Sequence, residues 1–400
     1  MRARKMLALT ALSALAVAGC SSLSEVARLR PVAAPLCRPP AGLVLVVGAH
    51  RNVPAPVLDG HLRCQVSAVV SAGKPVLIVV ASGQPQLITP RLMSVRGGTL
   101  AQQNSPRAAE DVQRIQALTR AARPDSPGAD DLAALAVAAD SARSAGIPRA
   151  ELVLIDSGLD DRGALDFTVP GMVAATPSEV ARQLRTSGNL PDLRGFMVTL
   201  VGLGYTAAPQ PPLPDKWRRN VTAIWASVMR SAGAAVQIVP QPAQDGPVQT
   251  SRPVRLVPVP SDQPARPRIH HLIVFTGASP VSFQPNTTAF ADPAAAQRAL
   301  RPIGRWLASS SSHHVWLVGT TADVGPMAGQ VRLSALRAGR VRAALIAMGA
   351  GATQMSSKGV GSHFPGFTPD RNAAGVLLAG PATLNRSVRI TLGTRRTRET

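Results

Sequence analysis

The sequence predicts an α/β protein: an N-terminal three-layer α/β domain with a mostly parallel sheet, a proline-rich linker and a C-terminal α/β sandwich. Two observations predict this class. In the first part of the chain, short apolar runs alternate with segments of helical periodicity, which is the pattern of a parallel sheet covered by helices. A segment with eight prolines in 28 residues then precedes a second series of strand and helix patterns. The predicted boundaries are residues 41–239, 240–267 and 268–395.

Five apolar runs form the predicted strands of the first domain. They lack the alternation of polar and apolar residues that marks a half-buried strand. Such runs are typical of strands that are buried on both faces of a parallel sheet. The runs are residues 42–48, 75–81, 152–155, 196–201 and 235–239.

Helical periodicity fills intervals between these strands. Thr176 and Pro177 stand at the N-cap and the first helical position of one helix, places that these residue types favour. Gly146 and Gly233 stand where helix-ending glycines are expected. The predicted helices are residues 106–122, 129–145, 177–186 and 217–232.

The first twenty residues predict export. A basic start precedes a predominantly apolar run of 14 residues, 6–19, whereas a membrane-spanning helix needs roughly 20. The run ends in Val-Ala-Gly-Cys, which resembles a bacterial lipobox. The resemblance implies that residues 1–20 are a lipoprotein signal peptide and that Cys20 carries the lipid, such as palmitate, with residues 21–40 as a tether. The protein would then be anchored at the extracytoplasmic face of the cell membrane. An ordinary signal peptide with an unrelated cysteine is the alternative.

Export changes what the two remaining cysteines predict. Outside the cytoplasm, an even pair is expected to form a disulfide rather than a metal site. Cys37 and Cys64 are therefore predicted to be bonded to each other. A metal site needs more ligands at short spacing, and only His50 and His61 lie nearby. Neither a metal nor a cofactor is expected.

A formal net charge of +21 favours an anionic partner. Aromatic residues make up only 3% of the chain, and no basic block is interleaved with them. Proteins that stack the bases of single-stranded nucleic acid need such aromatics, so nucleic acid is not the expected partner. An anionic wall polymer and a lipid headgroup remain as candidates, and a diffuse solvated surface of scattered arginines is the alternative.

One segment of the first domain resembles a known family. The sequence LVLIDSGLDDRG, residues 152–163, resembles the strand and acidic loop of von Willebrand factor A-like domains, and the fold is expected to be of that kind or Rossmann-like. The family's metal site needs Asp-x-Ser-x-Ser after the first strand, whereas residues 48–52 hold no carboxylate and Arg51 would repel a cation. An adhesion metal site is therefore not expected. The polar residues of the acidic loop are expected to be solvated: Asp156, Ser157, Asp160 and Asp161.

Catalytic motifs are not supported by their context. Residues 202–207 fit a Gly-x-Gly-x-x-Ala dinucleotide fingerprint after a predicted strand. The motif must open a helix, yet four prolines between residues 209 and 214 forbid one, so a turn is expected. The sequence also lacks a Gly-x-Ser-x-Gly nucleophile elbow. The protein is therefore not expected to be an enzyme.

The second domain resembles one family over several segments in the right order. LSALRAGRV at residues 333–341 and NRSVRITL at residues 385–392 resemble the second helix and the closing strand of OmpA-like peptidoglycan-binding domains. A loop at residues 366–384 is longer than usual. The matches to the first strand with its following turn, the first helix, the second strand with its binding loop, and the third strand with its turn are residues 281–290, 298–307, 315–325 and 358–365.

The resemblance implies a βαβαββ sandwich that binds the diaminopimelate of peptidoglycan stem peptides. In this family an aspartate after the second strand meets the ligand's amino group, and an arginine of the second helix meets its carboxylate. Arg337 matches the arginine, but Ala322 stands in place of the aspartate, and Asp323 follows one position later. The family more often has His, Asn and Arg where this chain has Thr320, Gln330 and Ser387. The candidate ligand-binding residues are Thr321, Asp323, Gln330, Arg337, Asn385 and Arg386.

Helical spacing places Gln330, Ser334 and Arg337 on one strip of the second helix. At the edge of an apolar face, the long side chain of Arg337 can be partly covered and still reach a groove. Alternatively, Arg337 only supports the fold by pairing with a nearby carboxylate or with loop carbonyls. Restoring an acid by Ala322→Asp is expected to strengthen ligand binding.

Together these features predict a membrane-anchored envelope lipoprotein that is tethered non-covalently to peptidoglycan. The first domain is expected to offer a surface for other exported proteins. Two alternatives remain open. One is a protein-interaction scaffold whose wall-binding site is lost, and the other is an enzyme that acts on envelope material.

Overall fold

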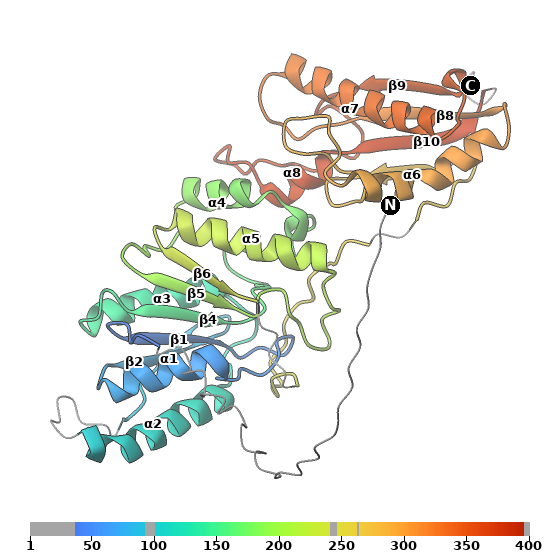
Figure 1. Ribbon diagram of the computed structural model, residues 1–400. Coiled ribbons are helices and arrows are strands. Elements are labelled where there is room, and N and C mark those ends of the chain that lie inside the picture. The colour runs from blue at the N-terminus through green and yellow to red at the C-terminus, as the bar shows by residue number, and fades with distance from the viewer. Residues whose placement is uncertain (1–36, 93–100, 241–245, 262–263, 396–400) are drawn as a thin grey trace, which may run out of the picture. The chain divides into compact units, whose positions relative to one another are not determined.

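The computed structural model describes residues 37–92, 101–240, 246–261 and 264–395. It contains a six-stranded sheet and a four-stranded sheet, each covered by helices (Figure 1). The predicted α/β class is therefore confirmed. The expected lipid attachment site, Cys20, lies outside the described residues.

The first sheet has the strand order β3-β2-β1-β4-β5-β6. All five strands expected from the apolar runs are present and parallel. The sixth, β3, is antiparallel and has only three residues, too few to give a pattern in the sequence. The strands are β1 (Leu43–Gly48), β2 (Val76–Ala81), β3 (Gln86–Ile88), β4 (Glu151–Ile155), β5 (Met197–Val201) and β6 (Ala235–Val239).

Three layers form because alternate side chains of a strand point to opposite faces. In β1, Leu43, Leu45 and Val47 pack with α1 and α2, whereas Val44 and Val46 pack with α3 and α5. The expectation of burial on both faces is wrong for β6, which lies at the sheet edge and is largely exposed. The helices are α1 (Gly60–Ser71), α2 (Ala101–Ala121), α3 (Asp131–Ser144), α4 (Pro177–Thr186) and α5 (Asp215–Ser231), with the 3-10 turn η1 (Met172–Ala174).

Most helix ends follow the sequence signals. Thr176 is the N-cap of α4 and Pro177 begins it, while Gly146 and Gly233 follow the ends of α3 and α5 with positive φ angles. The helix α1 is missing from the predicted set, because its buried side includes Gln65, which weakens the apolar periodicity.

The described part of the proline-rich segment contains no helix and lies along the first sheet and its helices. Gln210 donates to the carbonyl of Val257 over 3.1 Å and accepts from its backbone nitrogen over 2.8 Å. The indole of Trp217 donates to the carbonyl of Pro260 over 3.3 Å. Since backbone groups of the segment find partners in this way, it is attached rather than free along this stretch.

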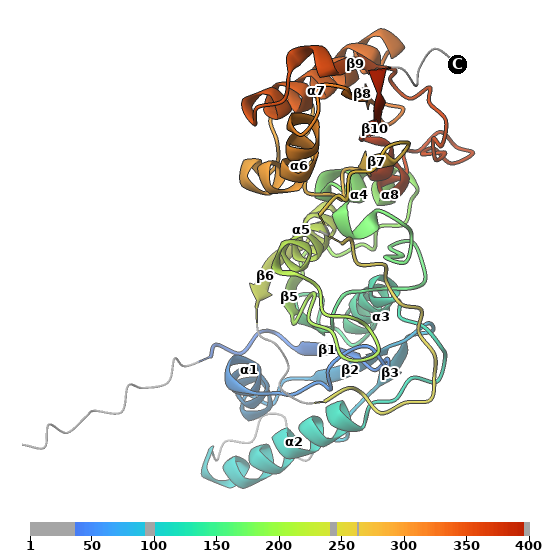
Figure 2. The same ribbon diagram turned by 90° about the vertical axis from the view of Figure 1, so that its right-hand side faces the viewer.

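The second sheet has the order β7-β10-β8-β9, with β8 and β9 parallel and β10 antiparallel to both neighbours. Figure 2 shows α6 and α7 on the same side of this sheet, and their apolar residues share one core with it. The elements are β7 (Leu272–Phe275), α6 (Pro293–Ala308), β8 (His313–Gly319), α7 (Met327–Ala347), η2 (Ala352–Gln354), β9 (Met355–Gly359), α8 (Ala379–Asn385) and β10 (Val388–Thr394).

Two details differ from the sequence expectation. The first strand is β7, not residues 281–290, which form a turn closed by a bridge between Phe283 and Phe290. Pro285 lacks a backbone donor and Asn286 has a φ of 56°, and both features interrupt a strand. The long loop contains the helix α8, whereas the third strand ends at Gly359 and is followed by a turn, as the match to residues 358–365 implies.

Candidate functional site

The helix α7 turns a polar strip toward the second sheet. Gln330, Ser334 and Arg337 lie along that strip and are each at most 5% exposed, as the spacing predicts. Two glycines at the strand ends let the helix approach. A Cβ at Gly319 would lie 1.9 Å from the carbonyl oxygen of Ser334, and a Cβ at Gly359 would lie 2.2 Å from a backbone nitrogen of α7. The strip is thereby held directly against the ends of β8 and β9.

The guanidinium of Arg337 is held by the turn at residues 281–290. Its Nε donates to the carbonyl of Thr287 over 3.0 Å, and Nη2 donates to that of Gln284 over 3.3 Å. The guanidinium carbon lies 5.1 Å from the centre of the Phe283 ring. The loop-carbonyl role that the sequence left open is therefore present.

Arg337 also keeps capacity for a ligand. Burial, and then the neighbouring charge of Arg386, lower the pKa of Arg337 to about 10, so it remains protonated at pH 7. Within the described chain, none of the ion pairs includes Arg337. An arginine has five N–H donors, of which Arg337 uses two here. A buried guanidinium without a counter-ion is suited to a ligand carboxylate.

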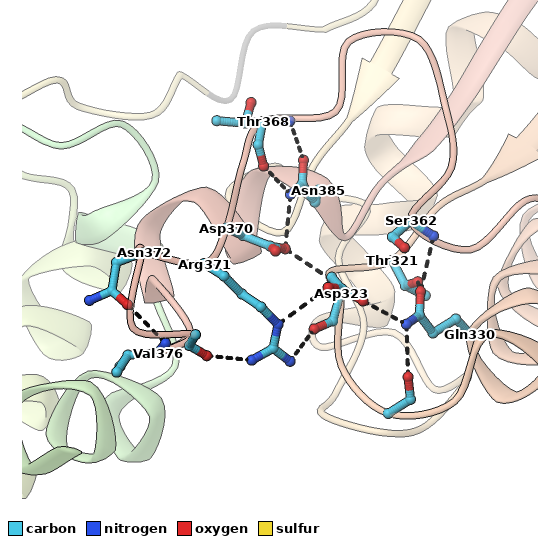
Figure 3. Close-up of polar contacts among 12 residues, drawn as sticks. Thr321, Asp323, Gln330, Ser362, Thr368, Asp370, Arg371, Asn372, Val376 and Asn385 are labelled. Carbon is cyan, nitrogen blue, oxygen red and sulfur yellow. Dashed lines mark hydrogen bonds and ion pairs between the residues drawn. The ribbon is translucent and has the colours of Figure 1, made fainter. Parts of the chain in front are cut away.

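Gln330 fixes the loop that leads into α7. Its amide nitrogen donates to Asp323 over 3.1 Å and to the carbonyl of Gly325 over 2.9 Å. Its amide oxygen accepts from the Thr321 hydroxyl over 3.4 Å and from the Ser362 backbone nitrogen over 3.1 Å (Figure 3). Thr321, Asp323 and Gln330 therefore form one hydrogen-bonded cluster, although Thr321 is nearly buried.

Asp323 is the carboxylate of this cluster that reaches the surface. Its side chain is 45% exposed, whereas Ala322 is 2% exposed. Arg371 bridges to it: Nε lies 3.2 Å from the Asp323 carboxylate, and Nη2 donates to the Asp323 carbonyl over 2.6 Å. Arg371 comes from the long loop, so the loop partly neutralises the charge of Asp323 (Figure 3).

Asp370 places a second carboxylate beside the position that Ala322 leaves apolar. It is 1% exposed, and its Oδ2 accepts from the backbone nitrogen of Asp323 and from the Asn385 amide, each over 3.0 Å. Its Oδ1 has no partner among the described atoms. Sequence reasoning missed Asp370 and Arg371. The only signal was the unusual length of their loop, which gives no side-chain positions.

Asn385 and Arg386 contact groups other than the Arg337 guanidinium. The Asn385 amide donates to the Thr368 carbonyl over 2.7 Å and accepts from the Thr368 nitrogen over 3.0 Å, which holds the loop in place. Arg386 forms two 2.7 Å bonds with the Glu179 carboxylate. A direct role of these two residues in ligand binding stays a prediction.

The two remaining departures from the family pattern compensate each other. The hydroxyls of Thr320 and Ser387 lie 2.7 Å apart, and Thr320 also donates to the Asn385 carbonyl over 2.6 Å. Both side chains are buried. Thr320 and Ser387 stand where the family more often has His and Arg, and their hydroxyls pair with each other, so neither is left unpaired.

Comparison with known proteins assigns a family to this part of the chain. Residues 282–374 match the OmpA family model. No curated protein matches the chain. The peptidoglycan-associated lipoprotein from Burkholderia pseudomallei is 25% identical, covers 29% of this chain and 94% of its own, and has a TM-score of 0.24. The periplasmic domain of MotB from Helicobacter pylori is 20% identical over 32% of this chain and 78% of its own, with a TM-score of 0.26.

The OmpA-family segment contains most of the candidate ligand-binding residues. It includes Asp323, Gln330, Arg337 and Asp370, whereas Asn385 follows its end. The OmpA-like domain of FopA1 from Francisella tularensis, another similar structure, is 15% identical over 31% of this chain and 72% of its own, with a TM-score of 0.23. Among the helices that the structure describes, none is both long enough and apolar enough to cross a membrane.

Outside the OmpA-family segment, the cysteine prediction is confirmed, because Cys37 and Cys64 are disulfide-bonded. The glycines of residues 202–207 form a turn, as expected: Gly202 and Gly204 have φ angles of 80° and 76°, and the next helix starts only at Asp215.

The expectation of a solvated acidic loop after β4 is wrong. Its polar side chains are at most 2% exposed, and backbone N–H groups distant in sequence bind two of them, Asp160 and Asp161. The carboxylate of Asp161 accepts from the backbone nitrogens of Ala129 and Arg255, each over 2.7 Å. Asp160 accepts from the first backbone nitrogens of α3. The buried residues are Asp156, Ser157, Asp160 and Asp161.

Proposed function

We propose that this chain is an envelope lipoprotein that holds peptidoglycan non-covalently through its OmpA-family domain. The observation that carries the proposal is Arg337, a buried guanidinium without a counter-ion at the place of the ligand arginine in α7. The lipidated residue would be Cys20, and the protein would act at the extracytoplasmic face of the cell membrane. The domain divisions at residues 41–239, 240–267 and 268–395 are part of this proposal.

The ligand is proposed to be the diaminopimelate of a stem peptide. Its carboxylate would accept from the free N–H groups of Arg337, while its ammonium would meet the exposed carboxylate of Asp323. Gln330 and Asp370 position Asp323 from either side, through its side chain and its backbone nitrogen. Thr321 and Asn385 would support the site indirectly: Thr321 donates to Gln330, and Asn385 donates to Asp370. Arg371 competes with the ammonium for Asp323, so the affinity is expected to be modest.

A second candidate function has its own support. Arg337 already donates to two loop carbonyls, and Ala322 removes the family's aspartate. A domain in which Arg337 is held by loop carbonyls would then serve as a scaffold for other exported proteins. The sequence also left this alternative open.

Retention on purified insoluble peptidoglycan separates the two. The full chain, purified in detergent, is mixed with wall material at about 0.15 M salt, where the Debye length of about 8 Å limits unspecific attraction. Wild type is expected to sediment with the wall, and Arg337→Ala to remain in solution. Arg332→Ala, which removes an equal charge from an exposed position of α7, is the matched control and should sediment. Equal sedimentation of all three proteins would favour the scaffold.

A further inference from the structure

The first sheet has a crevice that the proposed wall site does not use. Strand β1 lies between β2 and β4, so the strand order changes direction there. In parallel α/β sheets, ligands bind outside the carboxyl ends of the strands at such a point. Three side chains meet at this place: His50 follows β1, Asp156 follows β4, and Asp131 begins α3.

These three side chains form a compact donor set. One donor atom from each lies within 4.8 Å of the others, and each residue is at most 2% exposed. His50 Nε2 lies 2.7 Å from the Asp156 carboxylate, while its Nδ1 is hydrogen-bonded to the side-chain oxygen of Asn52. The Asn52 contact orients the imidazole with Nε2 toward the two carboxylates, as partners of metal-bound histidines commonly do.

Asp131 lacks the partners that its neighbours have. Both of its carboxylate oxygens are buried, and within the part of the chain that the structure describes neither accepts from an N–H or a hydroxyl group; the side chain that it contacts is another carboxyl group, that of Asp160. By contrast, Asp156 accepts from Gly158 over 2.9 Å and from Ser157 over 3.0 Å, and Asp160 accepts from the backbone of α3. An unpaired buried carboxylate is costly, so this one needs a cation or a proton.

We propose that His50, Asp131 and Asp156 bind one divalent transition-metal cation such as Zn²⁺. A neutral imidazole and two carboxylates neutralise the charge of a divalent ion, which a buried site requires. Three protein ligands of this kind leave one tetrahedral position open, and imidazole favours a transition metal over Mg²⁺. A pocket lined by Asp156, Asp59 and Tyr205 lies beside the site and offers a path for entry.

This donor set is not the Asp-x-Ser-x-Ser arrangement that the resemblance in the sequence implies. It contains an imidazole, and its second carboxylate comes from the first turn of α3. Arg51, which the sequence suggested would repel a cation, is exposed and is not among the three donors. Burial and then the charge of Asp156 raise the pKa of Asp131. At His50, burial lowers the pKa, but the charge and hydrogen bond of Asp156, together with Asp131 and Asn52, raise it to about 9.

The test is titration of the full chain, first stripped by a chelator, with ZnCl₂ in a calorimeter, together with thermal unfolding. Wild type should bind one strong equivalent and unfold at a higher temperature with Zn²⁺. Asp131→Asn should weaken this binding by at least about 100-fold, since ligand loss exceeds the effect of losing a supporting partner. Without metal, Asp131→Asn should unfold at the same or a higher temperature, because it removes an unpaired buried carboxyl. Asp140→Asn, on the exposed side of α3, should behave like wild type.

His50→Gln with Co²⁺ is the second measurement. Wild type should give the visible absorption of tetrahedral Co²⁺, and His50→Gln should not, whereas His271→Ala, at an exposed histidine elsewhere, should keep it. Binding weaker than about 1 mM in wild type, or equal affinity in wild type and Asp131→Asn, would overturn the proposal. So would a lower unfolding temperature of metal-free Asp131→Asn, because that result would give Asp131 a structural role.

Discussion

Replacing Ala322 with aspartate tests how the loop before α7 holds its charges. Ala322 is 2% exposed, and the following backbone nitrogen donates to Asp370 Oδ2 over 3.0 Å. The Cβ of a residue lies within about 3.5 Å of the next residue's nitrogen. A carboxylate at position 322 would therefore lie roughly 6 Å from that of Asp370.

The position of Asp370 leads us to expect the opposite of the prediction from the sequence that Ala322→Asp strengthens binding. Two carboxylates about 6 Å apart repel each other by about 3 kcal/mol at an effective dielectric constant of about 20. The single variant should lose on the order of 2–3 kcal/mol of folding free energy and gain no affinity for peptidoglycan. Combining Ala322→Asp with Asp370→Asn removes the repulsion, so the double variant should regain stability and bind more tightly.

Urea unfolding followed by circular dichroism measures the first effect, and sedimentation with insoluble peptidoglycan measures the second. Asp370→Asn alone is the control and should stay within about 1 kcal/mol of wild type, because an amide oxygen still accepts the two hydrogen bonds. The reasoning is refuted if Ala322→Asp keeps wild-type stability and sediments more strongly.

Three further outcomes follow from the structure and the sequence. Gly319→Ala should lower the free energy of unfolding in urea by about 2 kcal/mol or more, because its Cβ would lie 1.9 Å from the Ser334 carbonyl oxygen. In the control Gly329→Ala, the added Cβ has no atom within 4 Å, so this variant should stabilise α7 by about 0.5–1 kcal/mol. Equal effects of the two substitutions would contradict the close contact at Gly319. Reduction of the Cys37–Cys64 disulfide should lower the folding free energy by about 3 kcal/mol, and two titratable thiols in the unreduced protein would rule the bond out. In the native host, Cys20→Ala should leave an unacylated protein that is released or unprocessed, and membrane fractionation like wild type would argue against the lipobox.

The sequence predicts the parts of the fold that repeat a local pattern. Strands such as β1 and β2 are buried on both faces, so their side chains are apolar without interruption. The helix α7 shows its polar strip in the spacing of Gln330, Ser334 and Arg337. Short edge strands such as β3 have too few residues for a pattern.

The sequence does not reveal contacts between distant segments. The acidic loop after β4 looks solvated until Ala129 and Arg255 supply its hydrogen-bond donors. Likewise, Asp370 lies 47 residues after Asp323, and only the folded loop brings its carboxylate to that backbone nitrogen. Burial of a charged side chain depends on such partners, and their positions follow from tertiary structure alone.

The proposed recognition of a stem-peptide carboxylate by Arg337 is tested most directly by comparing two soluble ligands. Stem peptides with diaminopimelate and with lysine differ by one carboxylate at the third residue. Calorimetry with the full chain should show wild type binding the diaminopimelate peptide roughly 10- to 150-fold more tightly, since one charge-assisted hydrogen bond contributes about 1.5–3 kcal/mol. Arg337→Ala should bind both peptides equally weakly. Equal affinity of wild type for the two peptides, or an undiminished preference in Arg337→Ala, would contradict the proposed wall site.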